Sequence, residues 1–419
     1  MAIVGSGPAG FFLADALSKD GEIDVHLFEK LPYPFGLIRY GVAPDHQGTK
    51  AVTRVLSRVA KRANVRFFGG VEVGKRVSIE DLLRSYSVVV LATGATVGRK
   101  LDFDGANIRP QNTTAFDLVR SINGHPDYAE LCLPNQVKSV AVFGGGNVAL
   151  DCVRLICLPL QTLRTTDASR AFIEWRSKQR VKQVVMVMRG DASSAKFSPD
   201  MFSELKRLDG IGLRIEGSPE ALSFPHKCNP LSEIFSILSE SERENADVDV
   251  VLLFGHKPVS FSGRHLRLLD GKGLATGVGA DMIVHAVGQT SVPFPGVPFD
   301  ARDAKIPNRN GWVTGLDRCY TVGWASGSAR LAIPDCRSLA RHAASEIMGA
   351  LSQMEPSSMD PSLYEEVESI RHFAWADWER YDSSELELGK RAGACRVKLR
   401  SYSPCEELEG MELGNRPSN

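Results

Sequence analysis

Short apolar runs recur along the chain, and most of them end at a glycine or a charged residue. Runs of this length and composition are typical of buried parallel strands. They occupy residues 1–4, 24–28, 88–92, 140–143, 184–188, 250–254, 280–288 and 317–323. Segments with helical periodicity cover residues 11–17, 150–158 and 336–350. This alternation of strands and helices predicts an α/β fold.

Residues 49–62 have the pattern of one amphipathic helix. One side is apolar and the other is basic: Val52, Val55, Leu56 and Val59 against Lys50, Arg54, Arg58, Lys61 and Arg62. A solvated basic face is the preferred interpretation, and a docking surface for an acidic partner is the alternative.

Residues 30–46 are rich in proline, glycine and aromatic side chains. We expect neither a regular helix nor a strand here, but a loop that wraps a flat ligand or connects elements over a core. Residues 353–360 resemble a linker, and we expect the last ten residues to be frayed.

The first apolar run leads directly into the sequence G-x-G-x-x-G at residues 5–10. In a dinucleotide-binding turn, Gly5 permits the tight turn, Gly7 allows the backbone to approach a pyrophosphate, and Gly10 lets helix and strand pack closely. The second strand ends at Glu29, where a carboxylate accepts hydrogen bonds from the ribose hydroxyls. An acid at this position favours an adenosine without a 2′-phosphate.

A second motif of this kind, G-x-G-x-x-A, spans residues 144–149 after another apolar strand. The next strand ends at Arg189, which can pair with a 2′-phosphate and so favours NADP over NAD. One nucleotide site without and one with a phosphate-binding arginine together predict FAD and NADP(H) as cofactors.

The composition places the chain among ordinary soluble globular proteins. The 419 residues exceed one typical core, so two domains are expected. Fifty basic and fifty acidic residues cancel, which gives no support for a nucleic-acid or membrane-surface partner. No apolar run is long enough to span a bilayer, and a strand beginning at residue 2 leaves no room for a targeting segment on this chain.

The eight cysteines include no C-x-x-C pair, so no metal or iron–sulfur site is expected on this chain. Cys152 and Cys157 have the spacing of some flavin disulfide reductases. Five residues in a helix turn through about 500°, so we expect two separate, buried thiols in a reducing compartment.

Four stretches closely resemble the adrenodoxin reductase family of ferredoxin–NADP⁺ reductases. They are the glycine motif at 5–10, EKLPYPFGLIRYGVAPDH at 29–46, GGGNVALD at 144–151, and the pair Gly323-Trp324. The resemblance extends from residue 2 to about residue 382. It implies an NADPH:ferredoxin (adrenodoxin) oxidoreductase, a flavoprotein that passes electrons from NADPH through FAD to a [2Fe–2S] ferredoxin.

The resemblance also assigns roles to individual residues. His46 would lie near the redox centre, as a proton carrier or as a structural hydrogen-bonding histidine. The FAD contacts would be Gly5, Gly7, Ala9, Gly10, Glu29, Leu37, Val73, Trp324, Leu331, Ala332 and Ile333. The NADP contacts would be Gly145, Gly146, Asn147, Val148 and Arg189.

The chain departs from the family pattern on the nicotinamide side. Gly190 stands where a second phosphate-binding arginine is usual. Met201 aligns with a glutamate near the nicotinamide, and Glu204 lies one helical turn further on. Leu331 replaces a glycine that packs against flavin and nicotinamide. We therefore hypothesise intact FAD binding with reduced NADPH affinity, NADP preference or turnover.

Two further differences concern cations. Lys196 or Arg330 is expected to compensate in part for the missing arginine. The basic cluster that docks ferredoxin in the family is thinned, with His226 and Lys227 as its nearest remnant.

We expect two interlocked Rossmann-like domains, doubly wound and three-layered. The FAD domain would comprise residues 1–102 and 291–419, and the NADP domain would be inserted as residues 103–290. The resemblance implies a monomer that lies in the mitochondrial matrix if the source is eukaryotic. The alternative function is a diverged flavin-binding protein with weak or lost NADPH turnover that acts as a binding or assembly partner.

Overall fold

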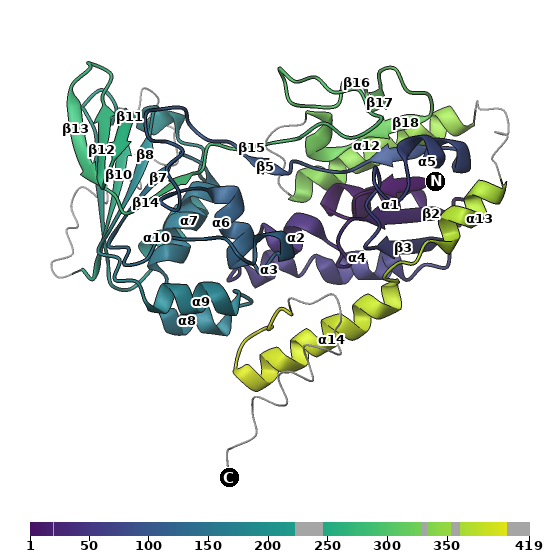
Figure 1. The fold of residues 1–419 in the computed structure, drawn as a ribbon, viewed down its shortest axis with the longest axis horizontal. Helices are drawn as coiled ribbons and strands as arrows, with labels where there is room; N and C mark the ends of the chain where they lie inside the picture. Colours follow the sequence, from purple (N-terminus) through teal and green to yellow (C-terminus); the bar gives the residue numbers. More distant parts are fainter. Residues whose placement is uncertain (20, 223–245, 328–332, 353–360, 400–419) are drawn as a thin grey trace, which may run out of the picture.

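The structure is a computed structural model that describes residues 1–19, 21–222, 246–327, 333–352 and 361–399. It has the α/β architecture that the sequence predicts, with two sheets in separate lobes, one parallel except for its β16-β17-β18 edge and one entirely parallel (Figure 1). Two short antiparallel strands, β5 (Val97–Gly98) and β15 (Gln289–Thr290), run side by side where the chain passes between the lobes.

The first sheet has β1 (Ala2–Val4) near its centre, between β2 (Val25–Glu29) and β4 (Val89–Leu91), with both pairings parallel. All three residues of β1 are buried, as expected for a strand covered on both faces. The remaining strands are β3 (Val65–Gly69), β18 (Cys319–Thr321), β17 (Trp312–Val313) and β16 (Asn308–Arg309), in the order β16-β17-β18-β4-β1-β2-β3.

Helices cover both faces of the first sheet. One face packs against α1 (Pro8–Leu17), α4 (Thr53–Ala60), α12 (Ile333–Leu351) and α14 (Trp375–Ala392). The other face packs against α5 (Ile79–Ser85) and α13 (Pro361–Ser369). Ile3 and Val4, neighbours on β1, belong to opposite cores, as the alternation of side chains along a strand requires.

The second sheet is entirely parallel, in the order β6-β14-β7-β8-β10-β9. Its strands are β6 (Asn112–Thr114), β7 (Ser139–Phe143), β8 (Gln183–Met188), β9 (Ile211–Glu216), β10 (Val248–Phe254) and β14 (Met282–His285). Every one of these strands lies between residues 103 and 290, and every strand of the first sheet lies outside that range.

The two faces of the second sheet are covered differently. One face packs against helices: α6 (Ala115–Ile122), α7 (Asn147–Cys157), α8 (Leu160–Thr165), α9 (Arg170–Ser177) and α10 (Pro199–Lys206). The other face packs against an antiparallel sheet of β11 (Lys257–Ser262), β12 (His265–Leu269) and β13 (Ala275–Gly279). The third layer of this lobe is therefore a sheet, because residues 257–279 fold back on themselves twice.

The segment at 30–46 corrects one expectation, because it contains a short helix, α2 (Gly36–Tyr40). The prolines at 32, 34 and 44 flank these five residues and leave them free to coil. Phe35, in a left-handed conformation, starts the helix.

The helix expected at 49–62 is interrupted. It forms as α3 (Gln47–Lys50) and α4, and the bonds from Arg54 N–H to Ala51 and from Val55 N–H to Val52 tighten the turn between them. Lys50, assigned above to the basic side, is buried against Asp167. A buried charge needs a partner inside the protein. Lys50 therefore faces inward, and the basic residues of this segment do not all lie on one exposed side.

Residues 353–360 and the last ten residues lie outside the described part of the chain.

Candidate functional site: two glycine turns and a charged cluster between them

The first glycine turn has the backbone geometry that its sequence predicts. Gly5 has φ +107°, and a Cβ there would lie 2.4 Å from the carbonyl oxygen of Ala92. A Cβ on Gly10 would lie 2.0 Å from the carbonyl oxygen of Gly5. A Cβ on Gly7 would meet no atom within 4 Å, so the Cα of Gly7 borders open space at the N-terminus of α1. Two glycines thus serve packing, and the middle one leaves room for a ligand.

Glu29 lies at the carboxyl end of β2, beside this turn. Its carboxylate accepts hydrogen bonds from the Ser6 N–H at 3.0 Å, the Ser6 hydroxyl at 2.8 Å and the Leu31 N–H at 3.2 Å. These bonds fix the carboxylate at the edge of the sheet where nucleotides bind in open α/β folds.

Segments distant in sequence close around the same turn. The Phe35 N–H donates to the Ser6 carbonyl at 2.9 Å, and a Cβ on Gly36 would lie 3.0 Å from the Cα of Gly7. A Cβ on Gly323 would lie 2.9 Å from the Cβ of Ala9. Trp324 belongs to the short 3-10 helix Gly323–Ser326. This helix therefore packs against the start of α1.

The other residues expected at the FAD site lie at varying distances from the turn. Leu37 is half-buried in α2, and Ile333 is the first residue of α12. Val73 is buried in the core on the far face of the sheet, two residues after Val71, whose N–H donates to the Glu29 carbonyl. Leu331 and Ala332 lie outside the described residues, as do Arg330, His226 and Lys227.

The second glycine turn repeats the geometry of the first. Gly144 has φ +144°, and a Cβ there would lie 2.3 Å from the Ala286 carbonyl. A Cβ on Gly146 would meet no atom within 4 Å, and α7 starts at the next residue, Asn147. Val148, in the first turn of α7, is 54% exposed. The loop and the start of α7 therefore offer free N–H groups to an anion.

Two exposed cations lie beside this turn. Arg189 directly follows β8, and it forms no ion pair with any residue that the structure describes. The Lys196 N–H donates to the Gly145 carbonyl at 2.7 Å, which brings Lys196 next to the glycine loop. A Cβ at Gly190 would lie 2.0 Å from the hydroxyl oxygen of Ser194, so a side chain at this position requires the Ser194 hydroxyl to rotate away.

A charged cluster joins the two lobes between the glycine turns. His46 Nε2 lies 2.8 Å from a carboxylate oxygen of Glu204 on α10, and His46 Nδ1 lies 3.9 Å from Asp151 on α7. Arg154, one turn further along α7, pairs with Asp151 at 2.7 Å and with Asp45. His46 thus bridges acidic groups on two helices of the second lobe.

Burial controls the ionisation of this cluster. It raises the pKa of Asp151 to about 7, with His46 opposing the rise and Glu204 adding to it. Burial also lowers the pKa of the Arg154 guanidinium. Asp151 makes no hydrogen bond to the imidazole at 3.9 Å, and Arg154 holds the same carboxylate oxygen at 2.7 Å.

Met201 and Glu204 lie one turn apart on α10 and have different surroundings. Met201 packs against the hydrophobic core of the second lobe. Glu204, three residues later on α10, reaches His46. α10 therefore places a carboxylate beside His46, one turn beyond Met201.

The sequence motifs named His46 and contained Asp45 and Asp151, but the cluster with Arg154 and Glu204 was not predicted. Asp151 and Arg154 are three residues apart on the helix that follows the glycine loop, and this spacing was the available signal. Cys152 and Cys157, by contrast, are both free and buried, as expected.

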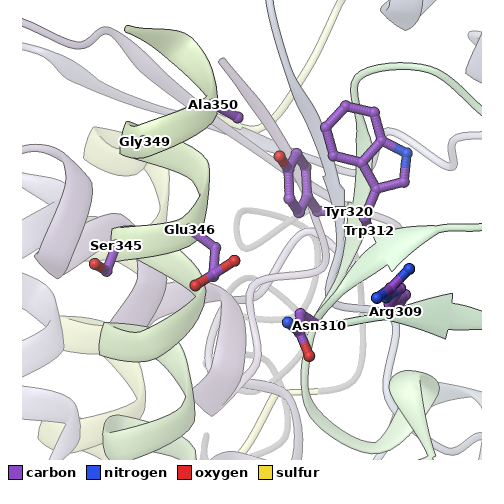
Figure 2. A pocket seen from close by; sticks show the side chains of 8 residues that line it. All are labelled: Arg309, Asn310, Trp312, Tyr320, Ser345, Glu346, Gly349 and Ala350. Carbon is purple, nitrogen blue, oxygen red and sulfur yellow. The ribbon is translucent and has the colours of Figure 1, made fainter. Parts of the chain in front are cut away.

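A cavity of about 320 Å³ lies elsewhere, between α12 and the β16–β17 turn (Figure 2). It is lined by Arg309, Asn310, Trp312, Tyr320, Ser345, Glu346, Gly349 and Ala350. Burial raises the pKa of the Tyr320 hydroxyl. The cavity shares no residue with either glycine turn.

Among the described helices, none combines the length and the apolar character needed to cross a membrane.

The described residues fit two dinucleotides. Each glycine turn offers an open Cα, at Gly7 and Gly146, at the N-terminus of a helix where a pyrophosphate can approach. The first turn carries a fixed carboxylate at Glu29 and the second an exposed Arg189, which match a ribose and a 2′-phosphate respectively.

Comparison with known proteins agrees with this geometry. Residues 1–202 match the pyridine nucleotide-disulphide oxidoreductase family. The chain is 31% identical to the mitochondrial NADPH:adrenodoxin oxidoreductase of Salvelinus fontinalis, over 95% of this chain and 89% of that protein. It is 29% identical to the NADPH-ferredoxin reductase FprA of Mycobacterium tuberculosis, over 99% of both.

The fold is also that of a solved relative. The structure of Mycobacterium tuberculosis FprA in complex with NADPH matches with a TM-score of 0.89 at 28% identity, covering 96% of this chain and 97% of that one.

Proposed function

The chain belongs to the adrenodoxin reductase family of ferredoxin–NADP⁺ reductases, and on this premise we propose that it is a flavoenzyme that carries electrons from NADPH through FAD to a [2Fe–2S] ferredoxin of the adrenodoxin type. The observation that carries the proposal is the pairing of two different glycine turns, one with Glu29 and one with Arg189, on either side of the His46 cluster. A bound flavin accepts electrons in a pair and releases them singly.

FAD is assigned to the first turn and NADP(H) to the second. In this assignment Gly7 and the start of α1 bind the FAD pyrophosphate, and Glu29 binds the adenosine ribose. Gly145 to Val148 bind the NADP pyrophosphate. The domain division, with residues 103–290 inserted into the FAD domain, is part of the same proposal, and the separation of the strands into two sheets supports it.

His46 is proposed to hold the proton that accompanies electron transfer. Its Nε2 lies 2.8 Å from Glu204 and its Nδ1 lies 3.9 Å from Asp151. Glu204 then orients the imidazole through its hydrogen bond to Nε2, and Asp151 lies too far from Nδ1 for a hydrogen bond. Arg154, almost fully buried, fixes Asp151 on α7.

The preference for NADPH over NADH is proposed to be modest. Arg189 is the one arginine at the end of β8 that faces the 2′-phosphate in this proposal, since the next residue, Gly190, has no side chain. Lys196, beside the glycine loop, supplies a second positive charge. A single lost charged contact costs roughly 1.5–3 kcal/mol, or about tenfold or more in preference.

The alternative function, a flavin-binding protein with weak or lost NADPH turnover, has limited support. The sequence argument for this alternative depended on the departures from the family pattern at Gly190, Met201 and Leu331. Glu204 supplies a carboxylate beside His46 from the same helix as Met201, and Leu331 lies outside the described residues. The lack of a second arginine at Gly190 weakens the preference for NADPH over NADH but does not remove the nucleotide site.

Partner and location are extensions of the same proposal. A monomer that docks a ferredoxin follows from the family. A mitochondrial matrix location, for a eukaryotic source, rests on the name of the Salvelinus fontinalis relative. Mycobacterial relatives of similar identity place the same fold in bacteria.

Steady-state turnover tests the function. The purified FAD-loaded protein is given NADPH with either ferricyanide or an acidic [2Fe–2S] ferredoxin coupled to cytochrome c. We expect reduction of both acceptors. Negligible turnover with either acceptor would contradict the enzyme and favour the binding protein.

A further inference from the structure

Residues 46–71 concentrate positive charge in a chain whose net charge is zero. This stretch holds six lysines and arginines and no aspartate or glutamate. Four of the six cations have carboxylate partners elsewhere: Lys50 with Asp167, Lys61 with Glu379, Arg62 with Asp15, and Arg66 with Glu368. Arg54 and Arg58 are exposed and form no ion pair with any described residue.

The placement of Arg54 and Arg58 disfavours the helix that carries them. Arg54 lies near the start of α4, where its own N–H already donates to the Ala51 carbonyl. Arg58 follows four residues later, so two like charges face each other on one side of the helix. Val55 between them is 52% exposed. Charges that oppose local stability without an internal partner point to a functional surface.

This surface begins beside the His46 cluster. The Lys50 N–H donates to the His46 carbonyl, and the chain continues through α3 and α4 with one tightened turn. For one straight helix, a rise of about 1.5 Å per residue corresponds to roughly 12 Å along the axis from His46 to Arg54 and roughly 18 Å to Arg58. Gln47, Gly48 and Thr49 on α3 are also exposed.

The dimensions suit a transient protein partner. Weak electron-transfer complexes bury less than about 1,200 Å² in total, which is a disc of roughly 14 Å radius on each partner. A disc of this size centred on α3 and α4 covers both arginines and reaches the edge of the His46 cluster. A cationic rim around an exposed apolar side chain is complementary to an acidic protein face.

We propose that the exposed face of α3 and α4, carrying Gln47, Arg54, Val55 and Arg58, is the surface on which the acidic [2Fe–2S] ferredoxin docks. The inference rests on the proposed function and names the docking surface for that partner. It selects the acidic-partner alternative for this helix over the solvated basic face.

Charge reversal at this surface is the test. The FAD-loaded full chain with Arg54→Glu and Arg58→Glu is compared with a matched control, Lys257→Glu and Arg267→Glu. The control residues are exposed, have no ion pair among the described residues, and lie in the antiparallel sheet at the far end of the molecule (Figure 1). Both variants lower the net charge equally.

The readouts are kcat/KM for an acidic [2Fe–2S] ferredoxin, its dependence on salt, and NADPH-driven ferricyanide reduction. We expect the α4 variant to lose at least tenfold in kcat/KM for ferredoxin at low salt and to lose most of the salt dependence. Ferricyanide reduction and FAD content stay within twofold of wild type, and so does every readout of the control. Arg54→Gln with Arg58→Gln should give an intermediate loss.

Each other outcome overturns the inference. Equal ferredoxin turnover in the α4 variant and the control would remove the docking surface and leave the proposed function intact. Wild-type protein that reduces ferricyanide but not the ferredoxin would instead contradict the proposed partner. If wild type binds anionic phospholipid vesicles through these arginines with ferredoxin turnover unchanged in the variant, the face belongs to a membrane contact.

Discussion

At the scale of single residues, Gly190 and Arg189 distinguish the second nucleotide site. The sequence motif predicts Arg189 as the phosphate-binding residue, because it ends the strand that follows the glycine loop and its helix. The proximity of Ser194 to Gly190 could not be predicted, since it depends on how residues 191–194 fold back over Gly190.

Replacement of Arg189 should separate the two coenzymes. Arg189→Ala is expected to raise the KM for NADPH by about tenfold or more, through loss of one charged phosphate contact, and to leave the KM for NADH within twofold. Arg207→Ala, another exposed arginine without an ion pair among the described residues, is the control. Equal effects of Arg189→Ala on both coenzymes in steady-state assays would remove this residue from the 2′-phosphate site.

At the scale of elements, the turn between β1 and α1 uses its glycines for two purposes. Gly10 is required by packing, since a Cβ there would overlap the carbonyl of Gly5. Gly7 has φ −74°, which any residue adopts, and a Cβ there meets nothing. Its glycine is therefore explained only by a ligand that approaches the backbone.

Two alanine variants separate these purposes. Gly7→Ala should leave the unfolding free energy of the apoprotein within about 0.5 kcal/mol and weaken FAD binding about tenfold or more, equivalent to about 1.4 kcal/mol. Gly10→Ala should destabilise the apoprotein by roughly 1–3 kcal/mol through overpacking. Urea unfolding and FAD titration of both apoproteins measure the difference. Undiminished FAD affinity in Gly7→Ala would contradict the proposed approach of the pyrophosphate.

Elements with a regular pattern were predictable from sequence. The glycine turns, β7, β8, β10 and α7 form where local apolar runs and glycines indicate them. The break between α3 and α4 was not predictable, because Lys50 turns inward to Asp167, which lies over a hundred residues away. The cluster at His46 was missed for the same reason, since its members come from three separate segments.

At the scale of the whole molecule, a buried ionic cluster joins both lobes to the C-terminal segment. Asp167 accepts hydrogen bonds from Lys50 at 2.8 Å and pairs with Lys398 at 3.0 Å, and both lysines also donate to Asn123. Burial opposes its ionisation, yet the two lysines lower the pKa of Asp167 to about 2. Burial lowers the pKa of Lys398 well below its usual range. The cluster holds two lysines against one carboxylate, and burial disfavours the charged form of Lys398.

Substitutions of Asp167 and Lys398 should therefore differ in their effect on the free energy of unfolding. Asp167→Asn leaves two buried lysines without a carboxylate and should cost roughly 3–5 kcal/mol of unfolding free energy. Lys398→Met removes the surplus charge with little change in volume and should cost less than about 1 kcal/mol. Urea unfolding of the FAD-loaded variants measures both. A loss in Lys398→Met as large as that in Asp167→Asn would show that both lysines are needed.

The central claim is that the two glycine turns hold FAD and NADP(H) in an arrangement that transfers electrons between them. An anaerobic titration of the purified protein with NADPH, and separately with NADH, tests it most directly through the visible flavin absorbance. The account predicts a yellow protein that NADPH bleaches stoichiometrically and that NADH bleaches at higher concentration. A yellow protein that neither nucleotide bleaches would contradict it.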